Sequence, residues 1–145
     1  MQHVKAMSVQ WPIDIKKKQH IQLCDKSMNL LLLNKNYVLI RRFSAKEEQR
    51  RLTAAPFIAQ RFNIDFIGIE NHLNYIYRPD GELSLEEACG LSVIYNSRLL
   101  NLYFSTFNGN TQVSATELRG MPLPPLETII NVGRYIMDIN VSTYY

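Results

Sequence analysis

The amino-acid sequence predicts an α+β fold in which a small, mostly antiparallel sheet is followed by helices within a single domain. A length of 145 residues with 46% hydrophobic and 20% charged residues is typical of one globular domain. Segments rich in β-branched and aromatic residues fill the middle of the chain, and from Ser84 onward apolar residues recur at helical spacing. Strands that precede helices favour an α+β architecture.

The chain begins with a segment, 1–36, that lacks clear periodicity. Trp11-Pro12 and the lysines at 16–18 predict an irregular or partly extended lead-in. Two interpretations stay open, the end of a linker from a longer protein or the mobile terminus of a complete one, and the first is favoured. We expect the folded domain to span 37–125, with a C-terminal helix and tail over 126–145.

Four segments in the middle of the chain are predicted to be strands, because their residues are mostly β-branched, aromatic or aliphatic. They are Tyr37–Phe43, Leu52–Ile58, Phe66–Ile69 and Leu73–Tyr77. Pro56 is expected at an edge or a bulge, because proline cannot donate to a sheet. The last two segments are expected to pair with each other, and Arg78–Gly81 matches a turn. Ser44–Glu47 fits either a capped helical turn or a polar loop.

Two capping patterns predict helix starts in the second half of the chain, at Ser84–Glu87 and at Ser114–Glu117. Apolar residues at helical spacing follow the first pattern, and we expect a break near Asn96-Ser97 to divide them into two helices. The prolines of 121–125 then impose an extended backbone before a final helix. One face of that helix is expected to carry Leu126, Ile129, Ile130, Gly133, Ile136 and Met137.

Charge and hydropathy predict a cytoplasmic protein without a membrane partner. The longest apolar stretch, Leu30–Leu33, is far shorter than the roughly 20 residues of a membrane span. The N-terminal residues lack the apolar core of a secretory signal. A net charge of +3 permits a polyanionic partner without requiring one.

The residue types that carry catalysis do not cluster in this sequence. The six glycines are scattered singly, so no methyl-donor, dinucleotide or phosphate-binding loop is predicted. Cys24 and Cys89 are isolated and the three histidines lie far apart, so we expect no metal site. Asp65 and Glu70 lack the following lysine of a metal-dependent nuclease. We therefore expect no catalytic residue and no bound cofactor in this chain.

Polar side chains gather in three other segments. Residues 41–51 place five cations in eleven positions, which would contact phosphates or form a salt-bridged surface turn. Residues 70–75 and 108–114 offer amides, hydroxyls and an imidazole, which bind base edges or stabilise turns. Taken together the segments favour DNA binding. The candidate residues are Arg41, Arg42, Ser44, Lys46, Arg50, Arg51, His72, Asn74, Tyr75, Asn110, Thr111, Gln112, Ser114 and Arg119.

Five segments resemble, in the same order, those of a known family of domains. They are 41–51, 70–75, 90–97, 103–104 and 109–125. They are similar to the C-terminal target-recognition, or TaqI-like specificity, domain of adenine-specific DNA methyltransferases from restriction-modification systems. The resemblance implies a module that docks on double-stranded DNA and helps to select the sequence whose adenine is flipped out and methylated.

The catalytic half of that family has no counterpart here, because the methyl-donor glycine motif and the Asn-Pro-Pro-aromatic loop are missing. The resemblance therefore implies that S-adenosylmethionine is bound by a catalytic domain outside this chain, in cis or in trans, and that this chain alone is inactive. A hypothesis of another class is a protein-interaction or scaffold subunit that docks through the proline segment and the C-terminal helix. A small complete enzyme is the third hypothesis.

Overall fold

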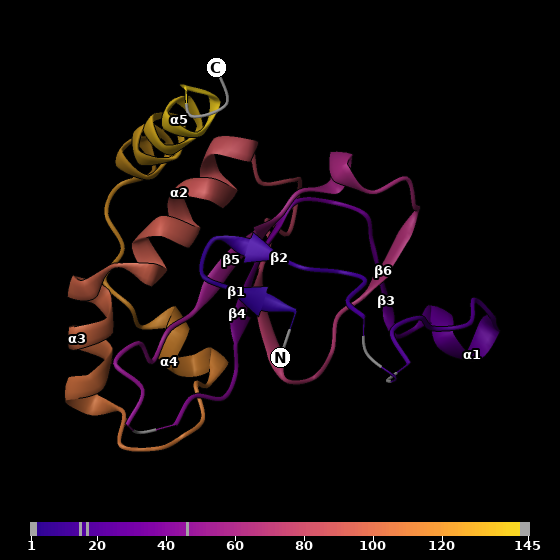
Figure 1. Cartoon of the computed structure of the whole chain (residues 1–145), viewed down its shortest axis with the longest axis horizontal. Coiled ribbons are helices and arrows are strands. Elements are labelled where there is room, and N and C mark those ends of the chain that lie inside the picture. The colour runs from indigo at the N-terminus through magenta and orange to yellow at the C-terminus, as the bar shows by residue number, and fades with distance from the viewer. Residues whose placement is uncertain (1–2, 15, 17, 46, 143–145) are drawn as a thin grey trace.

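A three-stranded antiparallel sheet forms the centre of the computed structural model, which describes residues 3–14, 16, 18–45 and 47–142 (Figure 1). The strand order is β5 (Ala54–Phe57), β4 (Tyr37–Arg41), β7 (Leu73–Ile76), and both pairings are antiparallel. Pro56 lies in β5, at the edge of this sheet, as predicted. The mixed α+β prediction is confirmed.

Two further sheets have two strands each. The hairpin of β1 (Val4–Lys5) and β2 (Ser8–Val9) contacts β5, where the amide of Met7 donates to the carbonyl of Ala54. The other sheet pairs β3 (Leu31–Leu33) with β6 (Phe66–Gly68). Between the hairpin and β3, a single helical turn forms α1 (Asp25–Met28).

The predicted pairing of Phe66–Ile69 with Leu73–Tyr77 is wrong. β6 pairs with β3, and β7 pairs with β4. The reason is that Leu31–Leu33, within the segment expected to be an irregular lead-in, supplies a strand partner for β6. Turn residues between two strands do not by themselves fix their pairing when each strand has a partner elsewhere in the sequence.

Both capping boxes are confirmed. The Ser84 hydroxyl accepts from the Glu87 amide at 3.1 Å, and α2 begins there (Leu85–Asn96). The Ser114 hydroxyl accepts from the Glu117 amide at 3.2 Å, and α4 begins there (Ala115–Arg119). The predicted break is also found, because Ser97 ends α2 and caps α3 (Arg98–Phe107). Of the two alternatives predicted for Ser44–Glu47, the structure has the polar loop, because Ser44, Ala45 and Glu47 form no helix.

Successive side chains of β4 point to opposite faces of the sheet, and a separate apolar cluster covers each face. Val38 and Ile40 face α2, α3 and α4, where Tyr95 and Phe104 complete the larger cluster. Tyr37 and Leu39 face the other way and join the cluster of Val4, Ala55, Phe57 and Ile67. Because both faces of β4 are covered, its residues 37–40 are all buried.

The last helix, α5 (Leu126–Ser142), lies against α2 on the side away from the sheet (Figure 1). On the predicted face Ile129 and Gly133 are buried and Ile130, Ile136 and Met137 are partly buried, whereas Leu126, the first residue of the helix, is 50% exposed. A short 3-10 helix (Ala59–Arg61) follows β5 at the opposite end of the sheet from Arg51. None of the helices in the described ranges has the length and hydropathy of a membrane span.

Candidate nucleic-acid interface

Three segments that are far apart in sequence meet beyond the end of β4. The Arg42 amide donates to the His72 carbonyl at 2.9 Å, and the Arg42 carbonyl accepts from the Val113 amide at 2.8 Å. One residue further, Phe43 and Gln112 form an isolated antiparallel bridge. We call the described residues of 41–51, 70–74 and 108–114 the three-segment surface. It brings together most of the residues that the sequence singled out.

Arg42 is partly exposed and held in a defined position at the centre of this surface. Its Nη1 donates to the Asn71 carbonyl at 3.2 Å, and its Nε and Nη2 lie 3.0 and 2.9 Å from one end of the Gln112 side-chain amide, which these two donors identify as the oxygen. The guanidinium carbon also stands 6.0 Å from the centre of the Phe43 ring. A cation fixed in this way pays little entropy when it contacts an anion.

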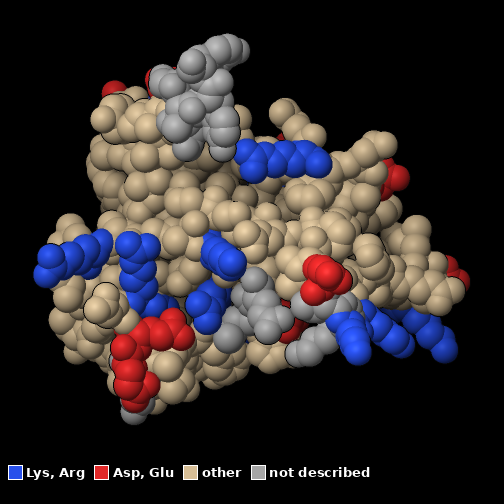
Figure 2. Space-filling model, in the orientation of Figure 1, with Lys and Arg blue, Asp and Glu red and all other residues tan. Residues whose placement is uncertain are grey.

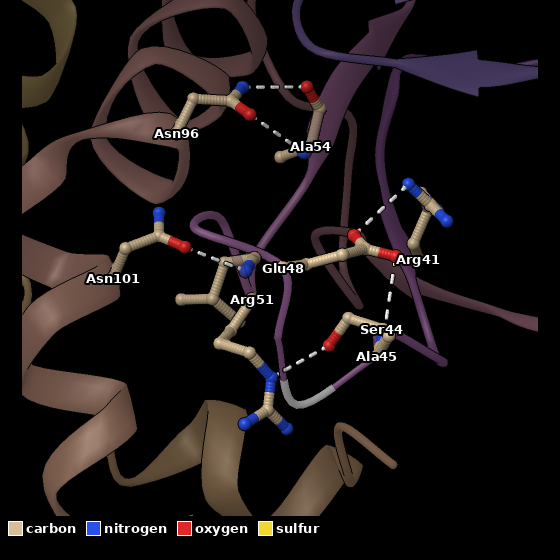
Figure 3. A network of polar contacts seen from close by, with 9 residues as sticks. Arg41, Ser44, Ala45, Glu48, Arg51, Ala54, Asn96 and Asn101 are labelled. Atoms are coloured by element: carbon tan, nitrogen blue, oxygen red, sulfur yellow. Dashed lines mark hydrogen bonds and ion pairs between the residues drawn. The ribbon is translucent and has the colours of Figure 1, made fainter. Parts of the chain in front are cut away.

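The other cations of 41–51 differ in accessibility. Arg41 pairs with Glu48, whose Oε2 lies 3.7 Å from Nη1 (Figure 3). Arg50 is exposed, whereas Arg51 is only 5% exposed. Lys46 lies outside the described residues. Arg42 and Arg50 are therefore the described arginines of this loop that are best placed to contact a phosphate.

Arg51 is buried and holds the loop to the segment that follows α3. Its Nε donates to the Ser44 hydroxyl at 2.9 Å (Figure 3). Its Nη2 donates to Oδ1 of Asn108 at 3.2 Å and also to the carbonyl of Asn110. Direct phosphate contact by Arg51 or by the buried Ser44 is excluded in this conformation, because neither side chain reaches solvent. Their polar atoms position the surface instead.

Two asparagines connect the same loop to the helices behind it. Oδ1 of Asn101 accepts from the Leu52 amide at 2.8 Å, and the Asn96 amide bonds both the N–H and the carbonyl of Ala54, at 3.2 and 2.7 Å (Figure 3). Buried backbone groups that lack a strand partner require such bonds. The loop that carries Arg50 and Arg51 is thus supported by α2 and α3.

The predicted site residues on β7 and just before it, His72, Asn74 and Tyr75, do not all lie on one side of the sheet. His72 is half exposed, bonds Glu70 through Nδ1, and stacks obliquely on Phe43 with ring centres 5.5 Å apart. The Asn74 side-chain amide donates to the Val113 carbonyl at 2.9 Å. This hydrogen bond holds the third segment against β7. Tyr75 lies on the other face, against Tyr37 at 5.8 Å, and so lies apart from the three-segment surface.

An open depression of about 280 Å³ lies in the third segment, lined by Asn110, Gln112, Ser114 and Glu117. The Ser114 hydroxyl is used as the cap of α4. Thr111 and Asn110 are exposed beside it. Arg119, at the far end of α4, is exposed. The surface is therefore a mixture of exposed amides and partly exposed cations.

Sequence reasoning did not include Asn108 among the site residues, although it holds the third segment in place. Nδ2 of Asn108 donates to the Gln112 carbonyl at 3.0 Å and to Oε1 of Glu117 at 2.7 Å. Its own oxygen accepts from Arg51, so Asn108 connects the buried guanidinium to the helix cap. In the sequence, the Asn-Gly pair at 108–109 indicates only a turn. The role of Asn108 in joining Arg51 to the helix cap becomes visible in the structure, where Asn108 is 3% exposed.

Charges of both signs occur near both ends of one face of the molecule. Figure 2 shows Lys and Arg gathered at the lower left and at the lower right of one face, with Asp and Glu beside them in both places. In the described part of the chain, no three His, Cys, Asp or Glu side chains come together as a metal site would require. The thiols of Cys24 and Cys89 are free, and Cys24 is exposed.

The chain is similar to two type II methyltransferases. It is 37% identical over 136 residues to the type II methyltransferase M.PstI of Providencia stuartii, and 36% identical over 136 residues to M.BsuBI of Bacillus subtilis. No family model and no solved structure matches the chain. The alignments cover 93% and 94% of this chain and 27% of each relative. The chain is therefore homologous to about a quarter of the length of these type II methyltransferases.

Proposed function

We propose that this chain is the DNA target-recognition part of a restriction-modification methyltransferase that acts on adenine N6. The three-segment surface is the observation that carries the proposal. It presents the fixed cation of Arg42 and exposed amides side by side, which are the groups that contact phosphates and base edges. Methyl transfer and binding of S-adenosylmethionine would belong to a catalytic part outside this chain, in cis or in trans.

The homology supports this division of labour. The chain corresponds to 27% of the length of each relative, so most of a type II methyltransferase lies outside the matched region. The matched part lacks the glycine-rich and Asn-Pro-Pro-aromatic motifs of methyl transfer. Recognition of the target is the remaining task to which its polar surface is suited.

The roles of the individual residues follow from their exposure. Arg42 and Arg50 would contact phosphates, while His72, Asn110, Thr111 and Gln112 would lie near the bases. Four other predicted residues support them, because Ser44, Arg51, Asn74 and Ser114 have their side chains engaged in internal hydrogen bonds.

The proposal is tested by measuring duplex-DNA binding of the chain at several salt concentrations. Each phosphate contact contributes about 0.9 to the slope of log K against log salt. Arg42→Ala with Arg50→Ala should therefore lower the slope by about 2 and weaken binding to all sequences. Arg61→Ala with Arg134→Ala is the matched control, because it removes the same charge at exposed positions outside the surface. Equal slopes for the two double variants, or no binding by the parent chain, would refute the proposal.

A protein-interaction role is the second candidate, and an exposed apolar stripe on α3 favours it. Leu99 is 79% exposed, and Leu102, Tyr103 and Phe107 follow it at helical spacing with exposures of 57%, 44% and 48%. The inner face of α5, in contrast, is occupied by α2. If this role is the main one, binding of a partner should depend only weakly on salt, because apolar contacts release few counterions.

A further inference from the structure

The side-chain amide of Gln112 has a defined orientation. Two donors of Arg42, Nε and Nη2, lie 3.0 and 2.9 Å from one end of this amide, and that end is therefore the oxygen. A carbonyl oxygen has two lone pairs, so the guanidinium saturates it. The other end is the amino group, which is a donor with two hydrogens.

The backbone at Gln112 is also held on several sides. Its carbonyl accepts from Nδ2 of Asn108 at 3.0 Å, and the residue bridges Phe43. The next amide, of Val113, donates to the Arg42 carbonyl. A side chain whose backbone and one amide end are fixed loses little entropy on binding, which suits a specificity-determining position.

Gln112 lines the open depression beside Asn110 and Ser114, whereas Arg42 does not. The fourth lining residue, Glu117, has both carboxylate oxygens occupied, by Nδ2 of Asn108 at 2.7 Å and by the Ser114 amide at 2.8 Å. Its acceptors are committed to the helix cap. The amino group of Gln112 is thus a donor that this part of the surface can offer to a ligand, beside the exposed side-chain amide of Asn110.

We infer that Gln112 determines specificity by donating from its amino group to the O6 and N7 acceptors of a guanine in the major groove, while Arg42 holds its oxygen. This inference rests on the proposed DNA-recognition function. Guanine presents two adjacent acceptors on its major-groove edge, which match the two hydrogens of the amino group. Cytosine presents the N4 amino group, a donor, at that edge, so it could not accept a hydrogen bond from the amino group of Gln112.

The fixed orientation also argues against the commonest glutamine contact with DNA. A bidentate glutamine–adenine pair needs the amide oxygen to accept from N6 of adenine while the amino group donates to N7. In Gln112 both lone pairs of that oxygen are used by Arg42. Arg42 therefore has a second role as a positioning residue: by binding the amide oxygen of Gln112, it leaves the amino group as the end that faces the DNA.

The test is selection of bound sequences from a randomised duplex library by the chain and by variants at 112. The parent should favour guanine at one position by about 5- to 100-fold. Gln112→Glu keeps an acceptor for Arg42 but presents an oxygen to the DNA, so the preference at that position should move to cytosine, whose N4 donates. Gln112→Met keeps the length of the side chain without either polar end, and it should abolish the preference at that position alone.

Gln60→Glu is the matched control, because it makes the same chemical change at an exposed position on the 3-10 helix at the other end of the sheet. It should leave the selected sequences unchanged. The inference is overturned if Gln112→Glu and Gln112→Met select the same sequences as the parent, or if the parent binds duplex DNA without preferring guanine at the affected position. Absence of any duplex binding by the parent would instead refute the proposed function itself.

Discussion

The guanidinium of Arg51 donates to Oδ1 of Asn108 at 3.2 Å across 57 residues of sequence. Both side chains are buried, with exposures of 5% and 3%. Since Asn108 in turn bonds Glu117 and the carbonyl of Gln112, this one contact connects the loop after β4 to the segment that lines the depression. The shape of the three-segment surface depends on a charged group that does not reach solvent.

Replacing Arg51 with methionine should lower the free energy of unfolding by about 1–3 kcal/mol. The substitution leaves the Ser44 hydroxyl and the Asn110 carbonyl without their donor, and an unsatisfied buried polar group costs about that amount. Urea denaturation measures the loss, and hydrogen exchange of the amides in 108–114 shows whether it is local. Arg50→Met is the control, because Arg50 is exposed and its replacement should change stability by less than about 0.5 kcal/mol. Equal stability of the two variants would contradict this role for Arg51.

Gly133→Ala should separate α5 from α2 and destabilise the protein by about 1–3 kcal/mol. A Cβ atom at Gly133 would overlap the backbone carbonyl of Glu86, and one at Gly90 would overlap that of Ile129. Alanine favours helix by about 1 kcal/mol over glycine, but backbone atoms cannot move aside as a flexible side chain can. The loss is measured by thermal or urea unfolding.

Gly109→Ala provides the matched comparison for that prediction. No atom lies within 4 Å of a Cβ built at Gly109, and its φ is not positive. The same change there should be neutral or slightly stabilising, by up to about 1 kcal/mol, because it restricts the unfolded chain. If Gly133→Ala were as stable as Gly109→Ala, the close packing of the two helices would not matter for stability.

Helix starts and the break at Ser97 could be predicted because their determinants are local. A hydroxyl and a glutamate three residues apart form a capping box whatever the rest of the chain does. Strand pairing is not local in this sense. The partner of β6 is a run of leucines more than thirty residues earlier, in a segment without periodicity, so the sequence favoured the wrong hairpin.

The candidate surface shows the same limit. Arg50 and Arg51 are adjacent and chemically identical, yet one is exposed and the other is buried. Which of the two side chains is buried depends on acceptors supplied by Ser44, Asn108 and Asn110. Asn108 and Asn110 lie in the segment that follows α3, more than fifty residues later in the sequence. Sequence pattern could indicate that the region is cationic, but the assignment of each arginine needed the tertiary contacts.

Alkaline pH should destabilise the protein through Tyr95. Burial raises the pKa of Tyr95 to about 12, and the ring lies in the larger apolar cluster with 2% exposure. The unfolded phenol ionises near pH 10, so stability from this group is complete below pH 10 and is lost as the pH rises towards 12. The loss amounts to about 2–3 kcal/mol, from 1.36 kcal/mol per pKa unit. Urea unfolding at pH 9 and at pH 11.5 should show most of it.

Tyr95→Phe separates this effect from the general titration of tyrosines and lysines. Phenylalanine keeps the ring in the cluster and gives up only a hydrogen bond of 3.5 Å to the Leu118 carbonyl, so stability at pH 9 should fall by about 1 kcal/mol or less. The variant should lose less stability than the parent between pH 9 and 11.5, because it has no phenol to ionise at this position. Tyr37, whose pKa burial also raises, is retained in both proteins and contributes equally. Parallel losses in the parent and in Tyr95→Phe would show that ionisation of Tyr95 does not limit stability at alkaline pH.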